Sequence, residues 1–288
     1  MPTELVFARL PSLVSAYARV LLGRRRGRPG KPADIPEVTA RVRDVRIDRA
    51  ALRRYREVCG FDPGTRVPAT YPQVLASGLL ARMLVHPVFP LPLLGVVHLR
   101  SVITAERALD EAERLDIDCA VGAHKEGERG LELDLLTQVS SGCQRVWSAV
   151  TTVLWRRPQH SEKTRLHLVA HHAPPAGGVR WDLDADLGRR YARVSHDYNP
   201  IHLYALTAKL FGFARPIVHG LWSLGHALAA LEGTLPAAPH RIEVDFKKPI
   251  LLPASVRFVS TREAAGVSFE VVTLDSQKTH LSGAVRRP

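Results

Sequence analysis

A carboxylate and an imidazole stand five residues apart in one short segment, Asp197 and His202. Between them Asn199 precedes Pro200, and a residue before proline is disfavoured in helical conformation, so the segment is predicted to turn. Pro200 suits the first turn of a helix, which we expect to run through Lys209. Across this turn Asp197 and His202 can converge on one water as an acceptor and a titratable group, a minimal acid/base pair.

A second informative run, Arg215-Pro-Ile-Val-His-Gly220, follows the first within twenty residues. It leads into an apolar stretch that predicts a helix through Leu231. The unpaired N–H groups and the dipole at such a helix start favour a developing oxyanion. Simpler interpretations stand beside these, because an aspartate near a helix start often only caps it. A lone histidine is likewise more often a surface or core residue than a reacting group, and His219 is assigned a structural role.

The elements that must position these groups follow one plan twice from about residue 40. In each half an apolar helix, predicted at 71–85 and 215–231, precedes segments with alternating or β-branched patterns typical of strands. The predicted strands cover residues 95–103, 115–123, 130–139 and 145–155, then 241–246, 255–260, 267–274 and 280–285. We therefore predict an α+β fold in which a curved antiparallel sheet wraps a long helix in each half. Residues 171–178, rich in proline and glycine, form the predicted boundary.

Residues 1–34 are predicted to form an N-terminal amphipathic and basic arm. Leu13, Tyr17 and Leu21 share one face of a predicted helix, and a run from Arg24 to Lys31 carries much of the positive charge. One interpretation is a helix docked on its own domain with a solvated basic linker. The other is a surface for peripheral membrane contact or for an acidic carrier protein.

Composition limits the possible classes. The 288 residues are 45% hydrophobic and 24% charged, with a net charge of +12, which favours an anionic partner. Three cysteines without paired spacing argue against a secreted disulfide scaffold and against a zinc site, so we expect a cytoplasmic protein. The longest apolar run, 87–97, is too short and proline-rich to span a membrane. Nucleic acid is not expected as a partner, because the aromatic content is low and the positive charge alone favours such a partner.

The two runs together resemble a known family. Ser-x-Asp-x-Asn-Pro-Ile-His at 195–202 and Gly-Phe-x-x-Pro-Ile-x-His-Gly at 212–220 are similar to the MaoC-like, or R-specific enoyl-CoA hydratase (hydratase 2), family. The two-half plan resembles its double-hotdog members, and Val97-His98 is also similar to such proteins. The resemblance implies a non-catalytic hotdog half at 35–172 and a catalytic half at 173–288.

The resemblance also implies roles for individual residues. Asp197 and His202 match the catalytic pair, with the choice of proton acceptor left open; Asn199 orients them, and the Gly220 N–H faces the thioester oxygen. The implied reaction is reversible hydration of a trans-2-enoyl thioester to the (R)-3-hydroxyacyl thioester. No metal or redox cofactor is implied, because coenzyme A or phosphopantetheine arrives as part of the substrate.

Further residues are assigned to substrate binding. Arg215, Lys247 and Lys248 could meet the substrate phosphates, and His196, which stands where the family usually has glycine, could narrow the site mouth. Histidine at position 196 causes no backbone strain provided its φ is negative.

Two alternatives to the hydratase remain: a hotdog enzyme that hydrolyses the thioester, and a non-catalytic acyl-thioester-binding or carrier-docking subunit. Whether two chains form a homodimer also stays open. In the first half Asp62 has no histidine five residues on, since Val67 stands there, so that half is predicted to be non-catalytic.

Overall fold

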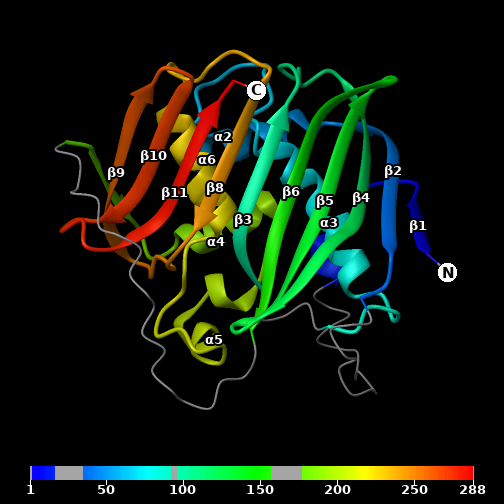
Figure 1. Ribbon diagram of the computed structural model, residues 1–288, viewed down its shortest axis with the longest axis horizontal. Coiled ribbons are helices and arrows are strands. Elements are labelled where there is room, and N and C mark those ends of the chain that lie inside the picture. Colours follow the sequence, from blue (N-terminus) through cyan, green and yellow to red (C-terminus); the bar gives the residue numbers. More distant parts are fainter. Residues whose placement is uncertain (1, 17–34, 92–95, 157–176, 288) are drawn as a thin grey trace.

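The computed structural model describes residues 2–16, 35–91, 96–156 and 177–287. Its sheet has eleven strands in the order β1-β2-β4-β5-β6-β3-β8-β11-β10-β9-β7. Figure 1 shows the sheet curving around the helices, which lie on one side of it. The predicted boundary at 172/173 and the basic run at 24–31 fall outside the described residues.

The first half places β2 before two helices and four strands. Its elements are β2 (Val38–Arg46), α2 (Arg49–Cys59), α3 (Tyr71–Leu84), β3 (Val96–Ala105), β4 (Arg114–Gly127), β5 (Gly130–Ser141) and β6 (Gln144–Arg156). The second half repeats the order with one inserted segment. Its elements are β7 (Val179–Leu183), α4 (Leu187–Ser195), the 3-10 turn η2 (Pro200–His202), α5 (Ala205–Lys209), α6 (Gly220–Ala230), β8 (His240–Phe246), β9 (Ala254–Glu263), β10 (Gly266–Thr273) and β11 (Thr279–Arg286). The α+β double-hotdog prediction is confirmed.

The beginning of the chain differs from the predicted arm. Thr3–Phe7 is strand β1, which pairs in parallel with β2 from Thr3↔Val38 to Phe7↔Val42. Residues 3–7 therefore belong to the sheet and not to an appended arm. Residues 13–16 are helical as expected, and Leu13 is buried against Ala81 of α3.

One antiparallel strand pair joins the two halves. Strand β3 of the first half pairs with β8 of the second, from Arg100↔Asp245 to Ala105↔His240. Behind the sheet, α3 packs on β2, β4 and β5. Leu79 of α3 and Leu224 of α6 are fully buried, so both helices contribute to a core shared with the inward faces of the strands.

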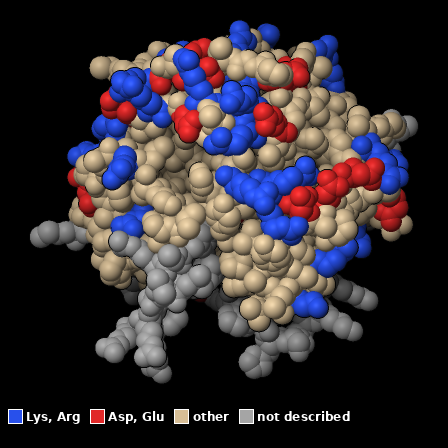
Figure 2. Space-filling view, turned by 180° about the vertical axis from the view of Figure 1, so that it is seen from behind, with Lys and Arg blue, Asp and Glu red and all other residues tan. Residues whose placement is uncertain are grey.

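Within the described residues, no helix combines the length and apolar composition needed to cross a membrane. On the face seen in Figure 2, Lys and Arg side chains gather in several groups with acidic side chains among them. Among the described residues, many surface charges are paired; Arg43 with Asp118 at 2.7 Å is one example. Exposed pairs of this kind contribute little stability each.

Candidate active site

The candidate site begins where helix α4 ends. Ser195 donates its hydroxyl to the Tyr191 carbonyl at 2.9 Å, and the Asp197 N–H donates to Ser195 Oγ at 3.2 Å. Between them His196 occupies the left-handed cap position with φ 59° and ψ 14°. This reversal ends the helix and brings Asp197 out of it at a fixed angle.

His196 corrects one expectation. Its φ is positive, whereas a cost-free histidine requires a negative φ. A side chain with a Cβ is strained in the left-handed region, which favours glycine. The His196 side chain is exposed. The structure thus gives a backbone reason why glycine would suit this position better than histidine.

Asn199 stabilises the turn with two hydrogen bonds. Its N–H donates to Asp197 Oδ1 at 3.1 Å, and its own Oδ1 accepts from the Ile201 N–H at 3.5 Å. The predicted continuous helix through Lys209 is wrong. The 3-10 turn η2 ends at His202, Tyr204 is extended with φ −139°, and a separate helix α5 follows.

His202 is held by the backbone of the second run. Its Nδ1 lies 2.7 Å from the Ile217 carbonyl oxygen. Because a carbonyl can only accept, Nδ1 carries the hydrogen and Nε2 carries the lone pair. Burial lowers the pKa of His202 while the Asp197 carboxylate opposes this shift. The imidazole is therefore neutral at pH 7 and able to accept a proton at Nε2.

Helix α4 approaches this histidine closely. A Cβ on Gly188 would lie 2.0 Å from the His202 carbonyl oxygen, so only glycine permits the packing. This contact presses η2 against the first turn of α4 and fixes the position of His202 relative to the helix that leads to Asp197.

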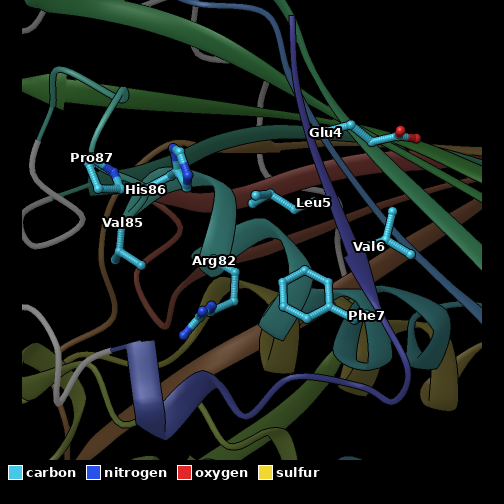
Figure 3. Close-up of a pocket in the computed structure, with 8 residues that line it drawn as sticks. All are labelled: Glu4, Leu5, Val6, Phe7, Arg82, Val85, His86 and Pro87. Atoms are coloured by element: carbon cyan, nitrogen blue, oxygen red, sulfur yellow. The ribbon is translucent and has the colours of Figure 1, made fainter.

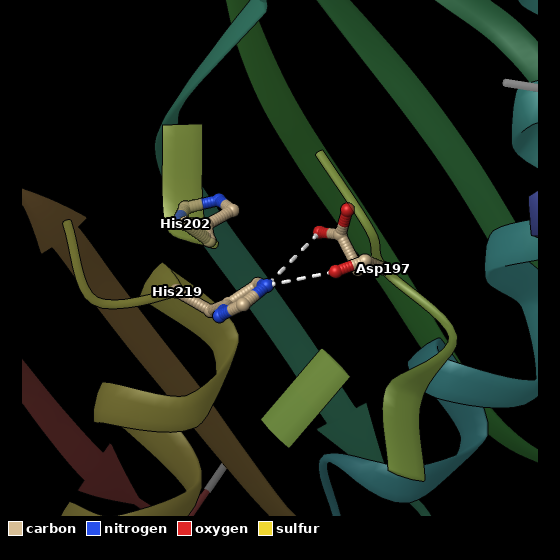
Figure 4. Close-up of side chains that lie close together, drawn as sticks. All are labelled: Asp197, His202 and His219. Atoms are coloured by element: carbon tan, nitrogen blue, oxygen red, sulfur yellow. Dashed lines mark hydrogen bonds and ion pairs between the residues drawn. The ribbon is translucent and has the colours of Figure 1, made fainter. Parts of the chain in front are cut away.

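His219 belongs to the same cluster, and its contacts agree with the structural role that the sequence assigned to it (Figure 4). Its ring stacks on that of His202, with centroids 3.7 Å apart. Its Nε2 donates to the Asp197 carbonyl at 3.0 Å and lies 4.0 Å from Asp197 Oδ2. Burial lowers its pKa to about 3, so it is neutral at pH 7. His219 therefore anchors the loop that presents the Asp197 carboxylate.

These three residues are also of types that bind metals. One ligand atom from each of Asp197, His202 and His219 lies within 4.8 Å of the others. The two imidazole planes are only 24° apart and stacked, so their lone pairs run in similar planes and do not converge. A tetrahedral zinc site needs convergent, deprotonated donors. The donation from His219 Nε2 to a carbonyl also opposes coordination, so the arrangement suits proton transfer better.

Gly220 is the first residue of α6, directly after His219. Its N–H has no acceptor within the helix because it lies in the first turn, where the helix dipole favours negative charge. A Cβ here would lie 3.1 Å from Cε1 of Phe246, so the Phe246 ring covers this residue closely. The site thus combines the Asp197–His202 pair with a backbone donor at a helix start.

The predicted phosphate-binding cations lie outside the cluster of Asp197, His202 and His219. Arg215 is exposed and donates to the Pro253 carbonyl at 3.3 Å. Lys247 and Lys248 come directly after β8, and the N–H groups of both donate to the His280 carbonyl. The role of these three cations in substrate binding stays a prediction.

A cavity of about 240 Å³ lies elsewhere, beside β1 and the end of α3 (Figure 3). Its lining residues are Glu4, Leu5, Val6, Phe7, Arg82, Val85, His86 and Pro87. Four of them belong to β1 and its surroundings at residues 4–7 and four to the first half at residues 82–87, and none was predicted as a site residue. In that half Asp62 donates its N–H to Glu232, outside any acid/base pair.

Comparison with known proteins identifies relatives of this chain in sequence and in fold. A family model described as a MaoC like domain matches residues 171–284. The 3-hydroxyacyl-thioester dehydratase X of Mycobacterium tuberculosis is 32% identical over 261 residues, which cover 88% of this chain and 90% of that protein. The crystal structure of HtdX from the same organism superposes with a TM-score of 0.76 at 31% identity, covering 86% of this chain and 99% of that one. A MaoC-like dehydratase from Phytophthora capsici shares the fold, with a TM-score of 0.68 at 19% identity over 89% of this chain and 99% of that one.

Proposed function

The chain belongs to the MaoC-like dehydratase family, and from this premise we propose that it catalyses reversible hydration of trans-2-enoyl thioesters to (R)-3-hydroxyacyl thioesters. The acyl group is carried on coenzyme A or on the phosphopantetheine of a carrier protein. One observation carries the proposal. The Ile217 carbonyl fixes the hydrogen of the buried His202 ring on Nδ1, and this ring lies close to the Asp197 carboxylate. A neutral imidazole with a basic Nε2 next to a carboxylate can hold and deprotonate one water.

In the hydration direction, His202 Nε2 takes one proton from the water as its oxygen forms a bond to C3. The Asp197 carboxylate accepts the second O–H of the water and stabilises the imidazolium that forms. The C2–C3 π electrons move toward the thioester, and the resulting enolate oxygen accepts from the Gly220 N–H. Such a donor is typically worth about 3–4 kcal/mol in a transition state.

The proton then passes from His202 Nε2 to C2, which restores the neutral imidazole. The hydroxyl and the hydrogen come from the same water on the same face, so the addition is syn. Dehydration is the reverse. Water addition moves no electrons to or from a carrier, so we propose that the reaction needs no redox cofactor. We also propose that it needs no metal, since the Asp197–His202 pair supplies the acid/base groups and the Gly220 N–H supplies the oxyanion donor.

The test measures loss of the enoyl-thioester absorbance band with crotonyl-CoA, longer trans-2-enoyl-CoA substrates and the matching acyl-carrier thioesters. Asp197→Asn keeps the side-chain size and an acceptor for the Asn199 N–H, but removes the charge. We expect it to lower kcat/KM about a thousandfold. Asp62→Asn in the first half is the matched control and should stay within about twofold of the wild type.

The product is resolved by chiral chromatography, where the (R)-3-hydroxyacyl form is expected. Turnover that survives Asp197→Asn would contradict the assigned pair. A folded wild type that converts neither CoA nor carrier thioesters would instead support a non-catalytic acyl-thioester-binding or carrier-docking subunit.

A further inference from the structure

A histidine of the first half reaches the edge of the site. Strand β3 pairs with β8 only as far as Arg100↔Asp245, and its register against β6 shifts between His98 and Arg100. Such a bulge re-aims a side chain. Beyond the last strand pair, the His98 ring packs on the Phe246 ring with centroids 4.5 Å apart and planes tilted by 45°.

Phe246 is the link from this histidine to the reaction. Its Cε1 and Cδ1 atoms would lie 3.1 and 3.2 Å from a Cβ placed on Gly220, so its ring rests on the first residue of α6. The contacts therefore run from His98 through Phe246 to the residue whose N–H is assigned to the thioester oxygen. The two aromatic side chains come from opposite halves, since β3 and β8 form the seam between them.

His98 is itself held in place. Its Nε2 lies 3.1 Å from the Arg100 carbonyl and must donate to it. Burial lowers the pKa of His98 to about 4, opposed by this hydrogen bond and by the Asp197 carboxylate, so the ring is neutral at pH 7. A neutral, anchored ring can support Phe246 by tilted aromatic packing.

We propose that His98 is a positioning residue: its ring holds Phe246 against Gly220, so that the half without a catalytic pair fixes the oxyanion donor of the other. The inference rests on the proposed hydratase function. Because the donor acts on charge that develops in the transition state, loss of this support should lower kcat more than it raises KM.

The experiment compares His98→Ala with His98→Phe, which keeps an aromatic ring. We expect His98→Ala to lower kcat about tenfold with KM within about twofold, and His98→Phe to recover most of kcat. His124→Ala, at an exposed position on β4 of the same half, is the matched control and should leave both constants unchanged.

A double-mutant cycle with Phe246→Leu tests whether the fall in kcat caused by His98→Ala acts through Phe246. If His98 acts through Phe246, adding His98→Ala to Phe246→Leu should cause little further loss of kcat. Independent, additive losses would overturn the proposal. So would a rise in KM alone, or a His98→Phe variant as impaired as His98→Ala while both remain folded by circular dichroism.

Wild-type turnover is measured before any variant, so that failure of the proposed hydratase function can be told apart from failure of the positioning role of His98. No turnover on any thioester would overturn the proposed function. In that case the same cycle is run on the midpoint of urea unfolding, where additive shifts would overturn the contact between His98 and Phe246 and non-additive shifts would support it.

Discussion

The two halves share the start of their helical layer and diverge directly after it. Helices α2 and α4 both end in a left-handed residue, Gly60 with φ 83° and His196 with φ 59°. Five residues before each cap stands a fully buried tyrosine, and the rings of Tyr55 and Tyr191 lie 6.2 Å apart between the halves. The same scaffold thus precedes the segment that holds Asp197 and His202 in the second half and a shorter segment without such a pair in the first.

The segment after the cap distinguishes the two halves. Thr70, which caps α3, lies ten residues after Gly60, whereas His219, which caps α6, lies 23 residues after His196. The longer segment holds η2, α5 and His202. Thr70 is occupied by a 2.7 Å hydrogen bond with Tyr55, while its counterpart His219 anchors Asp197. An insertion on a shared scaffold, and not a different scaffold, supplies the site.

Phe61→Asp challenges this comparison most strongly, because it gives the first half the carboxylate that comes after the cap in the second. Phe61 is only 8% exposed and lies near Tyr55 in the core. We expect the unfolding free energy to fall by about 3 kcal/mol or more, from lost apolar packing and burial of a charge. Turnover per folded molecule should not change, because Arg66, and not a histidine, stands five residues after position 61.

Urea unfolding and steady-state turnover measure the two quantities, with Phe61→Leu as the milder control. A second, additive activity in Phe61→Asp would show that a carboxylate after the cap is sufficient, contrary to the role given to the insertion.

The two helix caps should differ in their response to acid. The pKa of His219 is lowered by burial to about 3, whereas an unfolded histidine titrates near 6.5. The unfolded chain therefore binds a proton below pH 6.5 that the folded chain does not, so stability falls as the pH falls. For this group the loss is roughly 2 kcal/mol between pH 7 and pH 5.

His219→Thr copies the cap of the first half and removes this titration. Its decrease in unfolding free energy from pH 7 to pH 5, measured by urea denaturation, should be smaller than that of the wild type by this amount. An equal decrease in both proteins would mean that His219 is protonated in the fold, contrary to its burial.

The caps of α2 and α4 provide the smallest contrast. Gly60→Ala puts a Cβ at φ 83°, 3.2 Å from His226 Nδ1, and should destabilise by about 1 kcal/mol. His196→Gly relieves strain at an exposed position, but the greater freedom of unfolded glycine offsets much of the gain, so we expect a stabilisation below about 1 kcal/mol. Thermal unfolding of the two variants measures both; destabilisation by His196→Gly would show that the His196 side chain makes a contact worth more than the strain.

Most strands could be predicted because alternating apolar and polar residues, and β-branched residues, indicate a strand with one buried face. The predicted strand at 267–274 corresponds to β10 at Gly266–Thr273, and that at 241–246 to β8. Strand β1 was missed because it has five residues and its parallel partner β2 begins more than thirty residues later. Pairing over such a distance leaves no local pattern.

In the site, the motif predicted Asp197, Asn199, His202 and Gly220, and it gave His219 a structural role, which the hydrogen bond of His219 to the Asp197 carbonyl supports. The place of His219 in the Ile217–Gly220 run was a signal, but its stacking on His202 depends on how seventeen residues fold back. The break before α5 was missed because Pro200 predicts where a helix can start and not how far it continues.

By itself the sequence predicted the groups that we propose react, and it determined the turn that presents Asp197 and the repeated plan of the halves. These depend on residue type and on spacing within a few residues, which local sterics and hydrogen bonding translate directly into structure. Only the tertiary structure decided the hydrogen position on His202, the stacking of His219 on His202 and the contact of His98 with Phe246. Each of these depends on atoms brought together by packing of distant segments, and no local spacing records that.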